Sequence, residues 1–575
     1  MLNYRFIYGV IAILFLSCSV PKEQVDLIIH NATIYSVDSS FTVYEAMCIK
    51  DGRIVALNSN KEILKHYEAK ETTDAMGKTV FPGFIDAHCH FMGYGLGLQQ
   101  LDLTGTKSFD EVLQKVIDFS KREMISPEKT SATELKKDQH VKWIIGRGWD
   151  QNDWPNKVFP VRFKLDSLFP NTPILLTRID GHAVLANGKA LELAGINGSE
   201  NIKGGEIVSI ALSYSNVIST SAHKANIPTG MLIDNAIDLV KHAIPKPNRD
   251  ELYTALLNAQ TNCLAAGLTT VDDAGVMKTD VDAMDDLHKT GKLKIRIYAM
   301  LLDSAPNYKY YLEKGPYKTD RLNVRSFKFF ADGALGSRGA CLFKDYSDKP
   351  HWRGLLLNSM EHFKSYAELM DKKGFQMNTH CIGDSALNMV MDIYIRYCNE
   401  KTDHRWRIEH AQVITPDDFK NFSSDILPSV QPTHATSDMY WVKERLGEDR
   451  LKYAYAYKDL VDAAGKIALG TDFPVEDISP LKTFYAAVTR KDSKDYPEKG
   501  FQMENALTRL QTLKGMTIWA AYSNFEENEK GSLEKGKMAD FIILDTDLMT
   551  CKEPAILKTR VLATYIGGEK VFSSQ

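Results

Sequence analysis

The sequence predicts an α/β protein built around a closed (β/α)₈ barrel of the TIM type, with a long insertion after the first barrel strand. A small β-sandwich domain, formed by both chain ends, accompanies the barrel. Eight short apolar segments in the middle of the chain alternate with helix-prone segments, which is typical of a parallel sheet with helical crossovers. Both chain ends are rich in β-forming residues. At 575 residues the chain is also too long for one ordinary core.

The candidate barrel strands are short and apolar, and helix-prone stretches such as Met360 to Lys373 and Ser385 to Cys398 separate most of them. In chain order they are Phe84 to His88, Leu268 to Asp273, Lys294 to Leu301, Val324 to Ala331, Phe375 to His380, Arg405 to His410, Leu427 to Gln431 and Lys466 to Asp472. In a barrel of this kind the catalytic residues lie at the carboxyl ends of the strands.

The expected domain boundaries follow from these strands. The barrel should span residues 81–520, with an insertion at about 94–247 that is far too long for one helix. Residues 25–80 and 521–575 should build the β-sandwich domain together. The first of these segments contains Asp51-Gly52 between two β-rich runs, which is a hairpin signal. A long loop on the catalytic face of a barrel usually shapes substrate binding.

The N-terminal residues are predicted to be a leader segment for export. Arg5 precedes an apolar run, Phe6 to Leu16, that is too short for a stable membrane-spanning helix, and this indicates a secretory signal peptide over residues 1–17. The residues before Cys18 resemble a bacterial lipobox, with Phe15 a loose fit. The resemblance implies a lipid on Cys18, a tether over residues 18–24 and an exported lipoprotein anchored to a membrane of the bacterial cell envelope. The alternative is a plain cleaved signal.

Composition excludes several other classes. The formal net charge of −4 gives no reason to expect a nucleic-acid partner. The eight cysteines are scattered without a CxxC pair, which argues against a cysteine-rich zinc site and favours small buried hydrophobes. The oligomeric state stays open, with a homo-oligomer among the options.

Polar residues with metal-binding chemistry follow several of the predicted strands. His88 and His90 lie two positions apart at the end of the first strand, so both side chains point to the same side and can grip one ion. A pair of ordinary buried histidines is the alternative for this motif alone. Later strand ends add further candidate ligands: Lys328, His380, His410 and Asp472. Because a barrel brings the carboxyl ends of its strands to one mouth, these side chains are expected to converge.

In these motifs the sequence resembles the amidohydrolase superfamily. The resemblance covers nearly the whole chain after the leader: the split β domain, FPGFIDAHCH, the lysine on strand four, the histidines on strands five and six, TDFP on strand eight and the closing segment Gly531 to Asp540. Three further segments resemble the branch that includes N-substituted formamide deformylases: RIDGHAVLAN at 178–187, GLTTVDDAG at 267–275 and KFFADGALGSRGA at 328–340.

The resemblance implies a centre of one or two divalent metal ions. His88 and His90 would hold the more buried ion, and His380 and His410 would hold the second. Lys328 would be carboxylated by carbon dioxide, so that its carbamate bridges the two ions, while an unmodified lysine is the alternative. Phe327, Phe329 and Phe330 are expected to favour a neutral amine by excluding water. Zinc suits these ligands, and iron, nickel or manganese also fit.

Other residues receive roles with open alternatives. Asp472 is predicted to be both a ligand and a proton shuttle, the alternative being a turn residue. His434, after strand seven, is predicted to donate to a carbonyl oxygen. Four residues are candidates for substrate binding: Asp180, His182, Trp149 and Arg338. The alternatives are that Asp180 and His182 stabilise the insertion, that Trp149 belongs to a core and that Arg338 fixes a loop.

Together these features predict a metal-dependent amidohydrolase that cleaves a C–N bond, in an amide or N-formyl group of a small-molecule substrate, through a metal-activated hydroxide. A cyclic-amide or ester hydrolase on the same site is one alternative. A non-catalytic lipoprotein that binds small ligands is another.

Overall fold

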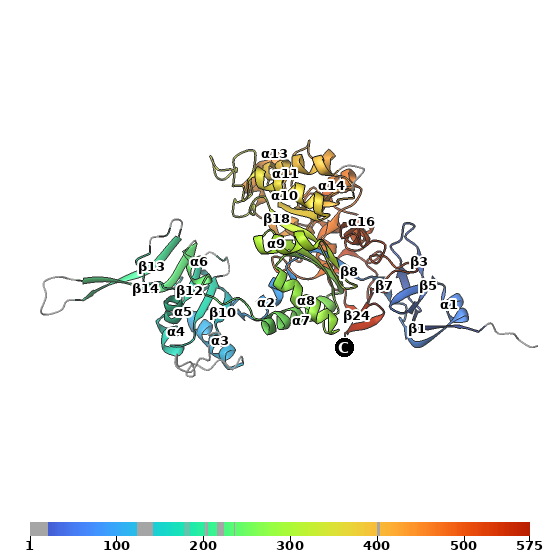
Figure 1. Ribbon diagram of the computed structural model, residues 1–575, viewed down its shortest axis with the longest axis horizontal. Coiled ribbons are helices and arrows are strands. Elements are labelled where there is room, and N and C mark those ends of the chain that lie inside the picture. Colours follow the sequence, from blue (N-terminus) through green and yellow to red (C-terminus); the bar gives the residue numbers. More distant parts are fainter. Residues whose placement is uncertain are drawn as a thin grey trace, which may run out of the picture. The chain divides into compact units, whose positions relative to one another are not determined.

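A computed structural model describes residues 21–122, 142–178, 181, 183–200, 202, 205–214, 223–234, 236–398 and 403–574. The predicted leader, with Cys18, lies outside these ranges and stays a prediction. The chain divides into two compact units, Met92–Ala259 and the remainder, Met1–Phe91 with Gln260–Gln575. Each unit is described by itself (Figure 1).

The larger unit contains the predicted barrel. Its parallel strands follow one another around the sheet in chain order. They are β8 (Phe84–Cys89), β15 (Leu268–Val276), β16 (Arg296–Leu302), β18 (Leu322–Phe330), β19 (Gln376–Cys381), β20 (Trp406–His410), β21 (Ile426–Val430) and β22 (Ala468–Leu469). The predicted barrel is confirmed, and each strand overlaps the segment expected for it.

The eighth strand is much shorter than the predicted Lys466 to Asp472. At Gly470 the chain leaves the ladder with β21 and crosses to the first strand. A Cβ on Gly470 would lie 2.5 Å from the backbone nitrogen of His88, so only glycine permits this approach. Asp472 then donates its N–H to the carbonyl of His88, and His90 donates to that of Phe473, both at 2.8 Å.

A buried carboxylate strengthens this seam between β8 and the residues after β22. Asp86 accepts hydrogen bonds from the backbone N–H of Thr471 at 2.9 Å and from its hydroxyl at 2.7 Å. Burial raises the pKa of Asp86 to about 7, although the hydrogen bonds from Thr471 oppose that shift. The first and last strands are therefore joined by side-chain and loop contacts instead of a regular ladder.

Helices follow the strands on the outside of the barrel (Figure 1). They include α8 (Lys278–Lys289), α9 (Ala305–Lys314), α10 (Met360–Lys373), α11 (Asp384–Tyr397) and α14 (Tyr457–Ala464). The sequence sets their ends: in α10 the hydroxyl of Ser359 accepts the N–H of His362, and Gly374 ends the helix in the left-handed conformation. None of the described helices is long and apolar enough to cross a membrane.

Both chain ends build the small β domain of the same unit. One sheet has the order β5-β4-β1-β6 and the other β25-β24-β23-β7-β2-β3. The N-terminal strands are β1 (Glu23–His30), β2 (Thr33–Tyr35), β3 (Val43–Tyr44), β4 (Ala46–Lys50), β5 (Arg53–Asn58), β6 (Tyr67–Asp74) and β7 (Thr79–Pro82), and the C-terminal ones are β23 (Phe541–Leu544), β24 (Val561–Ile566) and β25 (Glu569–Ser573). Leu27, Met47 and Phe541 share one core, so neither chain end forms this domain alone.

The second unit corresponds to the predicted insertion, with boundaries at Met92 and Ala259 where about 94–247 was expected. Its sheet has the order β13-β14-β12-β11-β10-β9. The strands are β9 (Leu101–Asp102), β10 (Ile144–Trp149), β11 (Ile174–Arg178), β12 (Ala183–Ala186), β13 (Gly205–Tyr214) and β14 (His223–Asp234). Helix α3 (Phe109–Arg122) packs on it through Val112, Val116 and Phe119.

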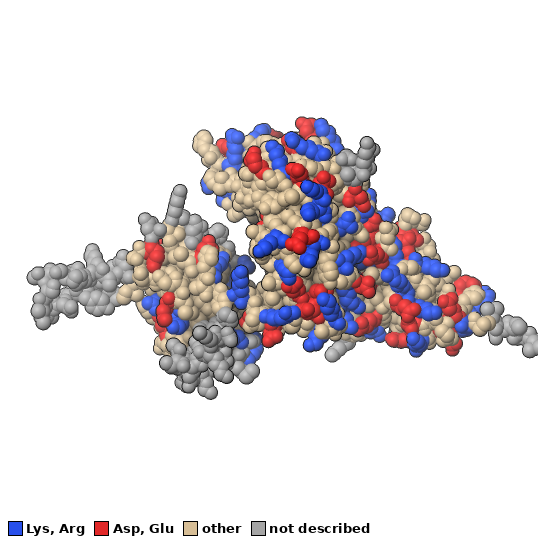
Figure 2. Space-filling view, in the orientation of Figure 1, with Lys and Arg blue, Asp and Glu red and all other residues tan. Residues whose placement is uncertain are grey.

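On the face shown in Figure 2, basic and acidic side chains are interspersed over the barrel and the small β domain. One ion pair that joins these two parts is buried. Arg296, at the start of β16, donates from Nε and Nη2 to Asp540 at 2.6 and 2.9 Å, and both side chains are about 95% buried. Burial alone would raise the pKa of Asp540, but Arg296 outweighs it and the pKa is lowered.

Replacing Arg296 with Met should destabilise the protein by about 3–5 kcal/mol, because Asp540 would remain buried without its partner. Urea unfolding measures this. Since the pKa of Asp540 is lowered on folding, the stabilisation is present above about pH 4 and is lost as the pH falls through the folded-state value. The difference from wild type should therefore shrink in acid. Lys70→Ala, which breaks an exposed pair with Asp26, is the control and should leave the urea midpoint nearly unchanged.

Candidate metal centre

Six strand ends bring histidine, lysine and carboxylate side chains together at the mouth of the barrel. The ring centroids of His88 and His410 are 4.8 Å apart, and those of His380 and His410 are 4.5 Å apart. His410 and Asp472 both have left-handed backbone conformations, with φ of 71° and 63°. Such strain in non-glycine residues is frequent at functional sites, where the surrounding structure holds it in place.

Two sets of donor atoms have the geometry of metal ligands. One consists of His88, His90 and Asp472, and the other of His410, His434 and Asp472, each with its donor atoms within 4.8 Å of one another. Asp472 belongs to both sets: Oδ1 lies 3.1 Å from His90 Nε2 and Oδ2 lies 3.5 Å from His434 Nε2. Among the described residues, the buried Nε2 atoms of His380 and His434 have no hydrogen-bond partner.

Hydrogen bonds from Nδ1 orient the rings of His90 and His410, so that Nε2 of each faces the centre. A backbone carbonyl can only accept, so His90 must donate from Nδ1 to Ala274 O, 2.9 Å away. Burial alone would lower the pKa of His90, but the hydrogen bond from Nε2 to Asp472 Oδ1 at 3.1 Å outweighs this and raises the pKa, so a metal ion here would replace the Nε2 proton. His410 Nδ1 is likewise 2.8 Å from the Gln431 side-chain oxygen, which leaves its Nε2 as an acceptor. Imidazole nitrogens and a carboxylate that converge in this way suit a cation, so the residues present fit a divalent metal.

Burial keeps three of the imidazoles neutral. It lowers the pKa of His88 to about 4 and that of His380 to about 3, with the Lys328 ammonium contributing in both cases. Burial, with the neighbouring His380, lowers the pKa of His410 well below its ordinary value. Only a neutral imidazole can ligate a metal, so these side chains are ready for one at neutral pH.

Lys328 lies in the middle of the centre. Its Nζ is 3.2 Å from His88 Nε2, and burial lowers its pKa to about 8. Phe330 lies on the same side, with its ring centroid 5.2 Å from Nζ. Phe327 and Phe329 do not flank the amine as expected. Alternation along β18 turns them to the outer face, where they pack on aromatic rings of α9 and α10.

A network of buried charged side chains orients the ring of His88 through Nδ1, on the side away from the centre. Glu409 Oε2 accepts from His88 Nδ1 at 2.5 Å, and Glu409 Oε1 lies 2.7 Å from Arg407 Nε. Arg407 also donates to Asp272 at 2.9 Å. Burial alone would raise the pKa of Glu409, but Arg407 and His88 reverse this and lower the pKa. A carboxylate behind a ligating histidine fixes the ring and raises its basicity.

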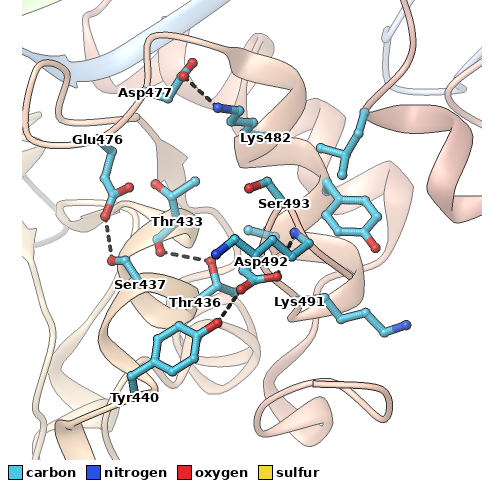
Figure 3. A pocket seen from close by; sticks show the side chains of 14 residues that line it. Thr433, Thr436, Ser437, Tyr440, Glu476, Asp477, Lys482, Lys491, Asp492 and Ser493 are labelled. Carbon is cyan, nitrogen blue, oxygen red and sulfur yellow. Dashed lines mark hydrogen bonds and ion pairs between the residues drawn. The ribbon is translucent and has the colours of Figure 1, made fainter. Parts of the chain in front are cut away.

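A separate cavity of about 360 Å³ lies beside helix α12 (Pro432–Asp438) (Figure 3). Thr433, Thr436 and Ser437 line it from one side of the helix, while His434 is not among its lining residues. Its polar groups largely pair with one another: Ser437 with Glu476 at 2.6 Å, Lys482 with Asp477 at 2.6 Å and Tyr440 with Asp492 at 2.5 Å. None of the candidate metal ligands lines this cavity.

The predicted substrate-binding residues do not join the centre. Trp149 is 1% exposed in a core of the second unit and donates its indole N–H to Leu176 O, which supports the core alternative. Arg338 donates from Nε and Nη2 to Asp348 at 3.1 and 2.7 Å, so its charge fixes a loop. Asp180 and His182 lie outside the described residues.

The sequence interpretation missed the residues that hold the ligands in place. Glu409 and Gln431 each touch a predicted histidine, and Asp332 accepts backbone N–H groups of Ile382 and Gly383 beside His380. A signal was available, because Glu409 immediately precedes His410 and Gln431 lies three residues before His434. A polar residue in an otherwise apolar buried strand needs a partner.

Comparison with known proteins agrees with this geometry. A model of the family described as "Amidohydrolase family" matches residues 71–572. The chain belongs to the amidohydrolase family. Its similarity to the putative amidohydrolase YtcJ of Bacillus subtilis is 30% identity over 94% of this chain and 98% of the relative. Protein LONG AFTER FAR-RED 3 of Arabidopsis thaliana is 32% identical over 95% of this chain and 91% of its own length.

Two further similarities support the family resemblance found in the sequence. The N-substituted formamide deformylase of Arthrobacter pascens is 26% identical over 94% of this chain and 97% of its own length. A crystal structure described as an uncharacterized metal-dependent hydrolase from Pyrococcus horikoshii superposes with a TM-score of 0.73 at 28% identity. That alignment covers 92% of this chain and 99% of the Pyrococcus chain.

If the candidate centre binds a divalent metal, Glu409→Gln should weaken that binding by roughly 10–100-fold, with zinc as the probe, because the amide cannot match the carboxylate that holds the ring of His88. Competition with a chelator measures the dissociation constant. The matched control is Glu526→Gln, which alters another buried carboxylate, paired with Lys530 at 2.7 Å, and should leave zinc affinity unchanged. Equal affinities for Glu409→Gln and wild type would show that Glu409 does not position a ligand.

Proposed function

We propose that the protein is a metal-dependent hydrolase that cleaves the C–N bond of an amide or N-formyl group in a small molecule. The observation that carries the proposal is the pair of donor sets that share Asp472 at the carboxyl ends of the barrel strands. Similarity to the deformylase of Arthrobacter pascens supports the choice of bond. A panel of N-acyl and N-formyl amines, with cyclic amides and esters alongside, tests it.

The residues that would hold the metal are His88, His90, Lys328, His380, His410 and Asp472. Zinc is the proposed ion, since imidazole and carboxylate ligands suit it. A bound zinc ion lowers the pKa of water to about 7 and polarises a carbonyl group. The protein supplies the fixed geometry: buried imidazoles in one tautomer and a carboxylate held by the seam of the barrel.

Asp472 is the proposed general base and acid. Burial on its own would raise its pKa, but the surrounding histidines outweigh that effect and lower it, so the carboxylate is ionised at neutral pH. One oxygen faces His90 and the other faces His434. An ionised carboxylate there can take the proton from the attacking water and return it to the leaving nitrogen. His434 belongs to the second donor set, but in this proposal its Nε2 donates to the substrate carbonyl oxygen instead of binding the metal.

Lys328 is proposed to be carboxylated. With its pKa lowered to about 8, roughly a tenth of the amine is neutral at pH 7, against less than a thousandth for an ordinary lysine. The neutral nitrogen attacks the carbon of carbon dioxide. An N–C bond forms, one C–O π bond breaks with its electron pair moving to oxygen, and one nitrogen proton leaves to solvent. The product is an anion whose two oxygens could ligate a cation, whereas an ammonium could not.

Lys328→Ala should lose most of the bound metal and most of the activity. Short carboxylic acids should restore part of both, because they can supply the missing oxygens. Metal analysis and turnover at increasing acetate concentration measure this. Lys466→Ala, on a half-buried lysine away from the centre, is the control and should show neither loss nor rescue. Normal metal content in Lys328→Ala would show that the lysine is no ligand.

Asp472→Asn should lower kcat by roughly 10²–10⁴-fold, because asparagine cannot accept and return a proton. The substitution preserves side-chain size, and metal content should change much less, since His88, His90, His380 and His410 remain. Asp477→Asn, in the same loop and paired with Lys482 on the surface, is the control and should keep the wild-type rate. A rate above about a tenth of wild type, or an unfolded variant, would assign Asp472 a structural role instead.

A further inference from the structure

The turn after helix α17 (Ile518–Ser523) lies at the amino end of the barrel and carries a fully buried asparagine, Asn524. Side chains from the amino ends of three barrel strands hold the backbone of this turn. They are Asn323 of β18, which donates to Asn524 O at 3.1 Å, Gln376 of β19, which donates to Ser523 O at 2.8 Å, and Arg405, just before β20, which donates to Tyr522 O at 2.7 Å. The turn is therefore a fixed floor of the barrel, at the end opposite the candidate metal centre.

The side chain of Asn524 reaches from this floor into the barrel and lies between a carboxylate and a guanidinium. Its Nδ2 donates to Asp272 Oδ1 at 2.6 Å, and its Oδ1 accepts from Arg407 Nη1 at 3.3 Å. Arg407 Nη1 also donates to Asp272 Oδ2 at 2.9 Å, so the three side chains close a ring of hydrogen bonds. All three are fully buried, so each depends on the other two for its hydrogen bonds within this ring.

The chemistry of this ring suits an amide. Toward Asp272 the side chain at position 524 must donate, and toward Arg407 it must accept. A carboxylate in its place could not donate, and an alkyl group could do neither. Burial raises the pKa of Asp272 to about 7, and the hydrogen bonds from Arg407 and Asn524 oppose that shift. Asn524 therefore favours the ionised carboxylate that pairs with Arg407.

Arg407 connects this ring to the candidate metal centre. The other nitrogens of its guanidinium face Glu409: Nε lies 2.7 Å from Oε1, and Nη2 donates to Oε2 at 3.3 Å. Glu409 Oε2 in turn accepts from His88 Nδ1. Because a guanidinium is planar and rigid, contacts that fix Nη1 at the floor also fix the nitrogens that face Glu409.

We infer that Asn524 is a positioning residue for the candidate metal centre: it fixes Asp272 and Arg407, and through them the carboxylate that orients His88. The inference rests on the proposed function in one respect, that His88 holds a metal ion. A residue that follows the last barrel strand, at the amino end of the barrel, thereby sets the geometry of a ligand at the carboxyl end.

Zinc affinity, measured on the full chain by competition with a chelator, tests this role. Asn524→Ala removes both hydrogen bonds, and Asn524→Leu removes them while keeping the volume of the side chain. In each variant the dissociation constant should rise roughly tenfold, the lower end of the range for residues behind a metal ligand. Asp272→Asn should weaken zinc binding at least as much. The matched control is Asn505→Ala, which truncates another buried asparagine of the same unit and should leave the affinity unchanged.

Exchanging the two side chains separates positioning from packing. The double variant Asp272→Asn/Asn524→Asp keeps one carboxylate and one amide beside Arg407, so it should regain most of the zinc affinity that the single variants lose. If Asn524 were only structural, Asn524→Ala would lower the urea midpoint while zinc affinity stayed at the wild-type value, and that result would overturn the inference. A folded double variant that binds zinc no better than the single variants would also overturn it.

Zinc affinity does not depend on the identity of the substrate, so this inference and the proposed function can fail separately. If the wild-type protein binds zinc but cleaves none of the N-acyl and N-formyl amines, the proposed function is wrong, whereas a tenfold loss of affinity in Asn524→Ala still supports the inference. Equal zinc affinities in all the variants would overturn the inference alone. A wild-type protein that binds no zinc would overturn both.

Discussion

The candidate metal centre depends on the seam between the first strand of the barrel and the residues after the last. Asp472 donates its backbone N–H to the carbonyl of His88, and Thr471 donates to Asp86. These contacts join positions almost four hundred residues apart in the chain. Without them Asp472 would lie on an unsupported loop, and its carboxylate could not stay within about 3 Å of His90. The strained φ of 63° at Asp472 is tolerated because this seam holds the backbone from both sides.

The second constraint is electrostatic. Arg407, Glu409 and Asp272 are fully buried, and a buried ion pair gives little net stability once desolvation is counted. Their arrangement is better explained by what it does to His88. Glu409 fixes the tautomer of that ring, and Arg407 keeps Glu409 ionised, so a lone pair always faces the centre. The barrel thus carries a costly buried network whose effect is to orient one ligand.

Much of the centre could be predicted because it depends on short-range rules. Alternation places His88 and His90 on one side of a strand, and parallel strands bring their carboxyl ends together. The same alternation, applied to Phe327 and Phe329, would have placed them away from Lys328. Glu409 was missed because its role comes from a ring 321 positions away. Trp149 remained ambiguous for a different reason, since a single sequence does not distinguish a buried core tryptophan from one that lines a pocket.

The accessibility of the candidate centre argues for turnover at this end of the barrel. The centre consists of imidazole, amine and carboxylate groups, and the His90 side chain is 34% exposed, so a substrate can reach it. A catalytic zinc site keeps one position open for water or substrate, whereas a structural site is enclosed by its ligands. Because the partly exposed His90 lies beside the fully buried His88, the centre combines a rigid inner side with an open outer side, and this combination suits a site that turns over.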